Sequence, residues 1–262
     1  MPNSQPITIS GVCYFASDFH FGVPNQEESK KREFRVIDWL DYIQKDAKHL
    51  FLLGDIFDFW FEYNGKPPAF YAEFLNKLAE LRKNGVELYF FTGNHDMWVK
   101  NYLKEYLGVH IFRKKQEFLI NDKKFLLGHG DGLGKGEWGY KCLKLFLNCK
   151  INRWLFGLIP PETGFAIAHF FSRKSRAMTP EHKERFLGNE KEFLVKFCCQ
   201  YLVNHDIDYF IFGHRHLPLE ITIKNAIYFN TGDWLNHNTY IRFEKNLHPI
   251  ISTNHFIKLS LT

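Results

Sequence analysis

The chain has 262 residues, of which 45% are hydrophobic and 24% are charged, and its formal net charge at pH 7 is +5. This length and composition support a sizeable core, which excludes a disordered chain and predicts one folded domain over residues 1–262. Residues 1–11 lack the pattern of a signal peptide, and no stretch has the roughly 20 uninterrupted apolar residues of a membrane-spanning helix. We therefore expect a soluble, intracellular protein.

Strand-like runs alternate with helical periodicity through the first half of the chain. The runs "VCYFAS" (12–17), "HLFLLG" (49–54) and "VELYFF" (86–91) predict strands, and residues 32–47 and 71–83 have the apolar spacing of helices. An alternation of strands and helices implies a parallel sheet with right-handed crossovers.

The second half of the chain resumes this pattern on either side of an atypical segment. "QEFLINDKKFLLG" (116–128) predicts a hairpin that turns at Asn121-Asp122. After Pro180 we expect a helix at 184–203, then strands at "YFIFG", "LEITI", "AIYFN" and "YIRFE". The sequence contains no internal repeat.

Residues 135–178 have the character of a helical insertion, or cap. Leu143, Leu147, Ile151, Trp154 and Leu158 make one apolar stripe at helical spacing, Pro160-Pro161 are expected to end that helix, and a shorter helical run covers 165–171. From 135 to 176 there are eight basic residues against two acidic ones. Such an excess fits either a solvated surface or a surface that meets an anionic partner.

Polar side chains follow five of the predicted strands. In sequence order they are Asp18 and His20; Asp55; Asn94, His95 and Asp96; His129; and His214 and His216. Each group alone is ordinary turn chemistry. Because ligands bind at the carboxyl ends of strands in open α/β sheets, we expect these side chains to converge.

The residue types indicate which chemistry this is. Two aspartates, one asparagine and four histidines make a mixed oxygen and nitrogen donor set, which suits Mn²⁺, Fe²⁺ or Zn²⁺ better than calcium. The five cysteines have no C-x-x-C spacing, which argues against a disulfide framework or a thiolate zinc site. Seven ligands exceed one tetrahedral site and match two ions, which together activate a water and clamp a phosphoryl group.

The ordered motifs Asp-x-His, Gly-Asp, Gly-Asn-His-Asp, Gly-His and Gly-His-x-His resemble those of the calcineurin-like metallophosphoesterases. The resemblance implies an α/β fold, a four-layer αββα sandwich, here with the helical cap at 135–178. It also implies that Asp18, His20 and His216 hold one metal, that Asn94, His129 and His214 hold the other, and that Asp55 bridges them. His95 would face the phosphoryl group, with Asp96 orienting it.

The whole chain also looks like the UDP-2,3-diacylglucosamine hydrolases of lipid A biosynthesis. The features that carry this are "GDIFDFWF", "HGD" followed by Gly139-Tyr140, an insertion ending in serine and basic residues, and a late "GDW". The implied reaction cleaves the pyrophosphate to UMP and 2,3-diacylglucosamine 1-phosphate, with two divalent ions, Mn²⁺ first. The substrate contacts we expect in the cap are Glu137, Tyr140, Ser172, Arg173, Lys174 and Arg176.

This likeness also implies partners and a location. We expect a lipid-linked nucleotide substrate and peripheral contact with the cytoplasmic face of the inner membrane, and neither nucleic acid nor an obligate protein partner. Two positions depart from the family, whose well-known members have arginine at the place of His95 and threonine at that of Arg215. A different phosphodiesterase or nuclease is the alternative activity, and a non-catalytic scaffold is the third reading.

Overall fold

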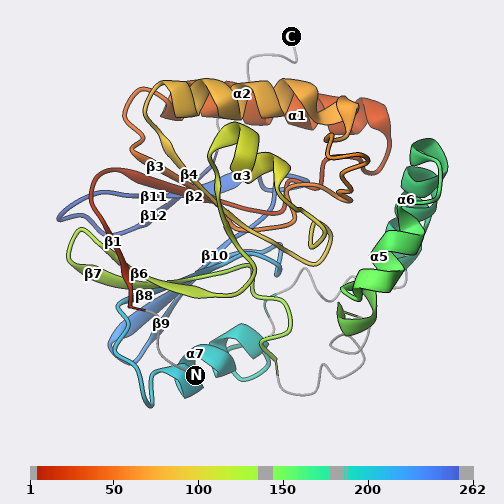
Figure 1. Ribbon diagram of the computed structural model, residues 1–262. Coiled ribbons are helices and arrows are strands. Elements are labelled where there is room, and N and C mark those ends of the chain that lie inside the picture. The colour runs from red at the N-terminus through yellow and green to blue at the C-terminus, as the bar shows by residue number, and fades with distance from the viewer. Residues whose placement is uncertain (1–4, 135–143, 178–185, 187, 254–262) are drawn as a thin grey trace, which may run out of the picture.

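Two six-stranded sheets pack face to face in the computed structural model, which describes residues 5–134, 144–177, 186 and 188–253 (Figure 1). The first sheet has the order β12 (Ile250–Thr253), β11 (Thr239–Phe243), β2 (Cys13–Ala16), β3 (His49–Leu52), β4 (Glu87–Phe91), β5 (His110–Phe112). The second has the order β1 (Ile7–Ile9), β6 (Gln116–Ile120), β7 (Lys123–Leu127), β8 (Tyr209–Phe212), β10 (Ala226–Thr231), β9 (Pro218–Ile223).

Helices cover the outer faces of both sheets. Strands β2 to β5 run parallel, and α1 (Gln26–Ile43), α2 (Ala72–Lys83), which follows the short 3₁₀ turn η1 (Ala69–Tyr71), and α3 (Tyr102–Leu107) lie over their outer face (Figure 1). Helix α7 (Phe193–Tyr201) lies over the outer face of the second sheet. The predicted four-layer sandwich is confirmed.

Strands β2, β3 and β4 of the first sheet are buried on both faces, which explains why their sequences are nearly continuous apolar runs. Alternate side chains point to opposite sides. Phe15 and Phe51 stack at 4.8 Å between their ring centroids in the layer between the sheets, whereas Tyr14 and Leu50 pack toward α1 and α2.

Local signals account for most element boundaries. Asn121 and Asp122 have φ of 48° and 68°, as a two-residue hairpin turn requires, so the predicted hairpin is confirmed. Helix α1 begins six residues before our expectation, because the Asn25 side chain accepts a hydrogen bond from the N–H of Glu28 and caps it. The helix expected at 184–203 was too long: residues 188–192 form turn and loop, and 178–185 and 187 lie outside the described residues.

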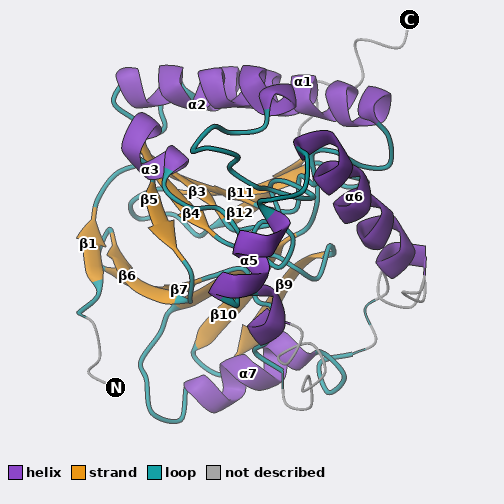
Figure 2. Cartoon of the chain, turned by 45° about the vertical axis from the view of Figure 1, so that its right-hand side comes forward, coloured by secondary structure: helices purple, strands orange, loops and turns teal. Residues whose placement is uncertain are grey.

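Helices α5 (Lys150–Phe156) and α6 (Pro161–Ala177) stand along one side of the sandwich (Figures 1 and 2). The single helix expected along the apolar stripe is broken at residues 148–149, and Pro161 is the first residue of α6, a position that suits proline. Among the described residues, no helix is long and apolar enough to cross a bilayer.

The apolar stripe of the cap is split between two environments. Leu147 and Phe156 pack on a cluster of Phe61, Met97 and Trp98. Ile151, Trp154 and Leu158 are instead exposed by 65%, 64% and 64%. Leu143 lies outside the described residues.

Candidate metal centre

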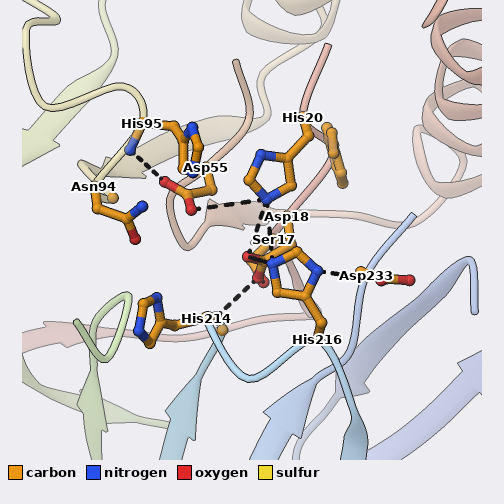
Figure 3. Close-up of polar contacts among 12 residues, drawn as sticks. Ser17, Asp18, His20, Asp55, Asn94, His95, His214, His216 and Asp233 are labelled. Carbon is orange, nitrogen blue, oxygen red and sulfur yellow. Dashed lines mark hydrogen bonds and ion pairs between the residues drawn. The ribbon is translucent and has the colours of Figure 1, made fainter. Parts of the chain in front are cut away.

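The predicted ligands lie together where strands of both sheets end (Figure 3). Asp18 and His20 follow β2, Asp55 follows β3 and Asn94 follows β4, all in the first sheet. From the second sheet come the three remaining residues, which are His129 after β7, and His214 and His216 after β8. The cluster therefore bridges the two sheets at one edge of the sandwich.

Three donor atoms converge around Asp18. Its Oδ1 lies 3.1 Å from Nε2 of His216 and 3.6 Å from Nε2 of His20, and the two Nε2 atoms are 3.2 Å apart. Asp18 Oδ1 is buried and accepts no hydrogen bond within the described part of the chain. A carboxylate oxygen and two ring nitrogens that face one point in this way have the donor chemistry of a divalent-ion site.

A second group of donors surrounds His129. Its Nε2 lies 3.2 Å from Oδ1 of Asn94 and 3.3 Å from Oδ2 of Asp55, and His214 completes a group with Asp55 and His129. The same Asp55 oxygen lies 3.7 Å from Nε2 of His20. Asp55 thus stands between the two groups, as a bridging ligand would.

The outer nitrogens of these imidazoles have partners of their own. Nδ1 of His129 lies 2.8 Å from the carbonyl oxygen of Leu53, and Nδ1 of His216 lies 3.3 Å from Oδ2 of Asp233. A proton held on Nδ1 by such a partner leaves the Nε2 lone pair directed into the cluster. The residues present therefore fit a pair of divalent ions.

The backbone adopts a rare conformation at five of the predicted ligands. Asp18, His20, Asp55, His214 and His216 have φ between 47° and 66°, in the left-handed region. A non-glycine residue there costs on the order of 1–3 kcal/mol, and such residues concentrate at functional sites. This backbone conformation directs all five side chains into the cluster.

Two of the glycines before the ligands are required for close approach. A Cβ on Gly93 would overlap the carboxylate of Asp55, and a Cβ on Gly213 would overlap the side chains of Ser17 and Asp18. Neither overlap can be relieved without moving a predicted ligand.

Attraction between the aspartates and the histidines dominates the electrostatics of the cluster. Burial opposes ionisation of Asp18, but His216 and His20 outweigh it and hold its pKa well below the usual range. Burial likewise opposes the charged forms of His129 and His216. Attraction to Asp55 outweighs burial at His129 and raises its pKa to about 10. Attraction to Asp18 does the same at His216, whose pKa also rises to about 10. Burial and then His129 lower the pKa of His214 to about 4.

His95 stands at the edge of the cluster. Its N–H donates to Oδ1 of Asp55 at 2.9 Å, and its ring packs edge-on against His20 with 4.8 Å between centroids. Its Nδ1 lies 3.1 Å from the carbonyl oxygen of Asp58 and 3.4 Å from Oδ1 of the same residue. Asp58, which was not among the predicted site residues, is the carboxylate beside this ring.

Asp96 has a different position from the one we expected. It is fully buried, its Oδ1 accepts from the N–H of Gly93 at 2.7 Å, and its Oδ2 accepts from the N–H of Ile56 at 2.8 Å. Burial, then repulsion by Asp55, raises its pKa to about 7. These contacts join the loops after β3 and β4, so Asp96 positions the backbone rather than the His95 ring.

The expected substrate contacts in the cap have mixed outcomes. Ser172 is buried and donates to Oδ1 of Asp58 at 2.9 Å, while Arg173 and Lys174 are exposed on α6. Glu137, Tyr140 and the side chain of Arg176 lie outside the described residues, so their contacts stay predictions. The signal for Asp58 was present in "GDIFD", a second carboxylate three residues after a ligand.

Arg215, which stands where well-known family members have threonine, is paired with a buried carboxylate. Its Nε lies 3.0 Å from Oε2 of Glu192, its Nη2 lies 3.0 Å from Oε1, and the side chains are only 10% and 4% exposed. Glu192 immediately precedes α7. The pair therefore attaches that helix to the loop that carries His214 and His216.

A model of the calcineurin-like phosphoesterase family matches residues 13–218. The chain belongs to the calcineurin-like phosphoesterases, whose members use a dinuclear metal centre, and it is a metal-dependent hydrolase.

Named relatives and solved structures add detail. The UDP-2,3-diacylglucosamine hydrolase of Porphyromonas gingivalis is 34% identical over 242 residues, which cover 87% of this chain and 92% of that protein. The protein of the same name from Yersinia pestis is 28% identical over 228 residues, or 84% and 90% of the two chains. Among solved structures, YfcE, a phosphoesterase from E. coli, has a TM-score of 0.45 at 18% identity and covers 93% of each chain.

Proposed function

We propose that the protein hydrolyses the pyrophosphate of UDP-2,3-diacylglucosamine to UMP and 2,3-diacylglucosamine 1-phosphate. The observation that carries this proposal is the 34% identity, over 87% of the chain, to a protein named for that substrate. The buried cluster of carboxylates and imidazoles supports it, because a phosphoanhydride is a substrate for two-metal hydrolysis.

Asp18, His20 and His216 would hold one ion, Asn94, His129 and His214 the other, and Asp55 would bridge them. When bound, the ions supply Lewis acidity and lower the pKa of water. We infer Mn²⁺ as the first choice, with Fe²⁺ or Zn²⁺ as alternatives, because all three accept mixed oxygen and nitrogen donors.

His95 is proposed to stabilise the charge that develops on the phosphoryl oxygens. It is one-fifth exposed at the edge of the cluster, and the Asp58 carboxylate 3.4 Å from its Nδ1 orients the ring. The leaving group is a phosphate monoester, whose second pKa is about 6, so a general acid is optional for this reaction. Asp96 supports this arrangement by joining the loops that carry Asp55 and His95.

The outer surface of the cap is proposed to meet the lipid. Trp154 and Phe171 are exposed by 64% and 62%, and Arg173 and Lys174 are exposed beside Phe171 on α6. An apolar surface with adjacent cations suits acyl chains next to phosphates, and a bilayer that contains anionic lipids. We infer peripheral contact with the cytoplasmic face of the inner membrane, where such a substrate would be presented.

The test is hydrolysis of UDP-2,3-diacylglucosamine by protein reconstituted with Mn²⁺, beside bis(p-nitrophenyl) phosphate as a generic diester. We expect rapid release of UMP and slow cleavage of the diester, with both lost in Asp55→Asn. Asp38→Asn, at an exposed position on α1, is the matched control and should keep full activity. Efficient diester cleavage without UMP release would instead support the alternative, a different phosphodiesterase in which His95 serves a poorer leaving group.

A further inference from the structure

A cavity of about 260 Å³ opens beside His129. Its walls come from the loop between β5 and β6, from the end of β7, and from the first described residue of the cap. At about 30 Å³ per water molecule in the liquid, this space exceeds what a phosphate ion fills. It is therefore large enough for a bigger ligand than phosphate alone.

The wall of this cavity is strongly cationic. Four basic residues line it, which are Arg113, Lys114, Lys115 and Lys144, against the single carboxylate of Asp131. A wall with this balance of charge concentrates an anion.

Several of these cations are held in place by contacts with the core. Arg113 donates to the carbonyl oxygens of Met97 and Val99, the second at 2.6 Å. The Lys115 ammonium lies 5.3 Å from the centre of the Tyr201 ring, and Lys144 forms an ion pair with Asp131. Pre-positioned cations lose little entropy when an anion binds.

The cavity lies on a different flank of the metal centre from helix α6. His129, which lines the cavity, belongs to the group with Asn94 and Asp55. Helix α6 instead reaches the group of donors around Asp18, which includes His20. Ser172 of α6 contacts Asp58, and Oδ1 of Asp58 lies 3.5 Å from Nδ1 of His20. A substrate cleaved between these flanks would have one half on each.

We propose that this cationic cavity binds the nucleoside monophosphate half of the substrate, while the cap binds the acylated half. The inference rests on the proposed function, which supplies a substrate with one lipid half and one polar, anionic half. The cavity has the cations for the phosphate and additional volume for the nucleoside, whereas α5 and α6 expose large apolar side chains such as Trp154 and Phe171.

Binding of UMP to the Mn²⁺-loaded protein, measured by isothermal titration calorimetry, tests the proposal. Lys114 is exposed, so its replacement leaves the core intact. We expect Lys114→Glu to weaken UMP binding by roughly tenfold, the loss typical of one charge-assisted hydrogen bond. Lys83→Glu, a charge reversal at an exposed lysine at the end of α2, should leave UMP affinity unchanged.

Two further ligands show which half of the substrate the cavity takes. Inorganic phosphate should bind more weakly than UMP, and inhibition by 2,3-diacylglucosamine 1-phosphate should be the same in wild type and Lys114→Glu. Unchanged UMP affinity in Lys114→Glu, or a loss confined to the lipid product, would overturn the cavity assignment. If the cavity assignment fails but the wild-type protein releases UMP from the full substrate, the proposed function stands. If the wild-type protein neither releases nor binds UMP, both proposals fail.

Discussion

Ser172 of helix α6 donates a hydrogen bond of 2.9 Å to the carboxylate of Asp58, which lies 114 residues earlier in the chain. The other oxygen of Asp58 lies 3.3 Å from Nδ1 of His169, also on α6. The same residue stands beside Nδ1 of His95. One buried carboxylate therefore connects the cap to the metal centre.

Loss of the Ser172 hydroxyl should loosen the cap. In Ser172→Ala the buried Asp58 carboxylate loses a donor, which costs on the order of 1–3 kcal/mol. We expect kcat/KM for the lipid substrate to fall by roughly tenfold, while cleavage of bis(p-nitrophenyl) phosphate changes little. Ser10→Ala, at an exposed serine before β2, is the control. Equal losses on both substrates would show that the hydroxyl acts on the metal centre and not on the cap.

Asp58→Asn should impair His95. The variant keeps the shape of the side chain but removes the charge beside Nδ1 of His95 and of the predicted ligand His20. Loss of a carboxylate partner behind a metal-ligating histidine typically costs about 10–100-fold. We expect this loss in kcat at saturating Mn²⁺, with KM less affected, and a displaced pH profile of kcat. Asp38→Asn is again the control. A normal kcat with an unshifted profile would argue against a positioning role for Asp58.

Metal binding should release protons. The pKa values of His129 and His216 are raised to about 10 in the metal-free cluster, so both rings are protonated at pH 7 and must lose protons to act as ligands. Apparent Mn²⁺ affinity should therefore rise as pH rises from 6 to 8. Titration calorimetry in two buffers with different ionisation enthalpies measures the protons released. Identical heats in the two buffers would contradict the expectation.

Arg215 should matter for stability more than for catalysis. Its ion pair with Glu192 is nearly buried, and removal of one partner from such a pair costs about 3 kcal/mol because the other charge is stranded. We expect Arg215→Met to lower the free energy of unfolding in urea by that amount. Arg215→Met combined with Glu192→Gln should recover part of it. No recovery in the double variant would mean that packing, and not the stranded charge, causes the loss.

The exposed surface of the cap should bind membranes. Trp154→Glu should reduce co-sedimentation with vesicles that contain anionic phospholipid, because it places a charge in an apolar surface. The control is Tyr106→Glu on α3, an aromatic residue that is 68% exposed away from the cap. Equal effects of the two substitutions would exclude a specific role for the cap in membrane contact.

The strand ends and the metal-ligand residues that follow them could be predicted from the sequence, because a short segment carries each of these two signals. A buried strand appears as an apolar run, and a glycine followed by aspartate, asparagine or histidine marks the place where it ends. The hairpin at Asn121-Asp122 was predictable for the same reason, since two adjacent residues determine the turn. The short strands β1, β5 and β12 have three or four residues each and give no comparable signal, because their pairing with neighbours defines them.

The contacts of the polar side chains could not be predicted from the sequence, because they form only in the folded tertiary structure. Asp58 is three residues from the predicted ligand Asp55 and Asp96 is two residues from Asn94, yet the first lies beside the His95 ring and the second binds backbone N–H groups. Ser172 and Arg215 gave no sign that each would be turned inward toward a buried carboxylate. Residue types and strand ends are properties of short segments, whereas the choice between carboxylates is made by contacts between segments far apart in the chain.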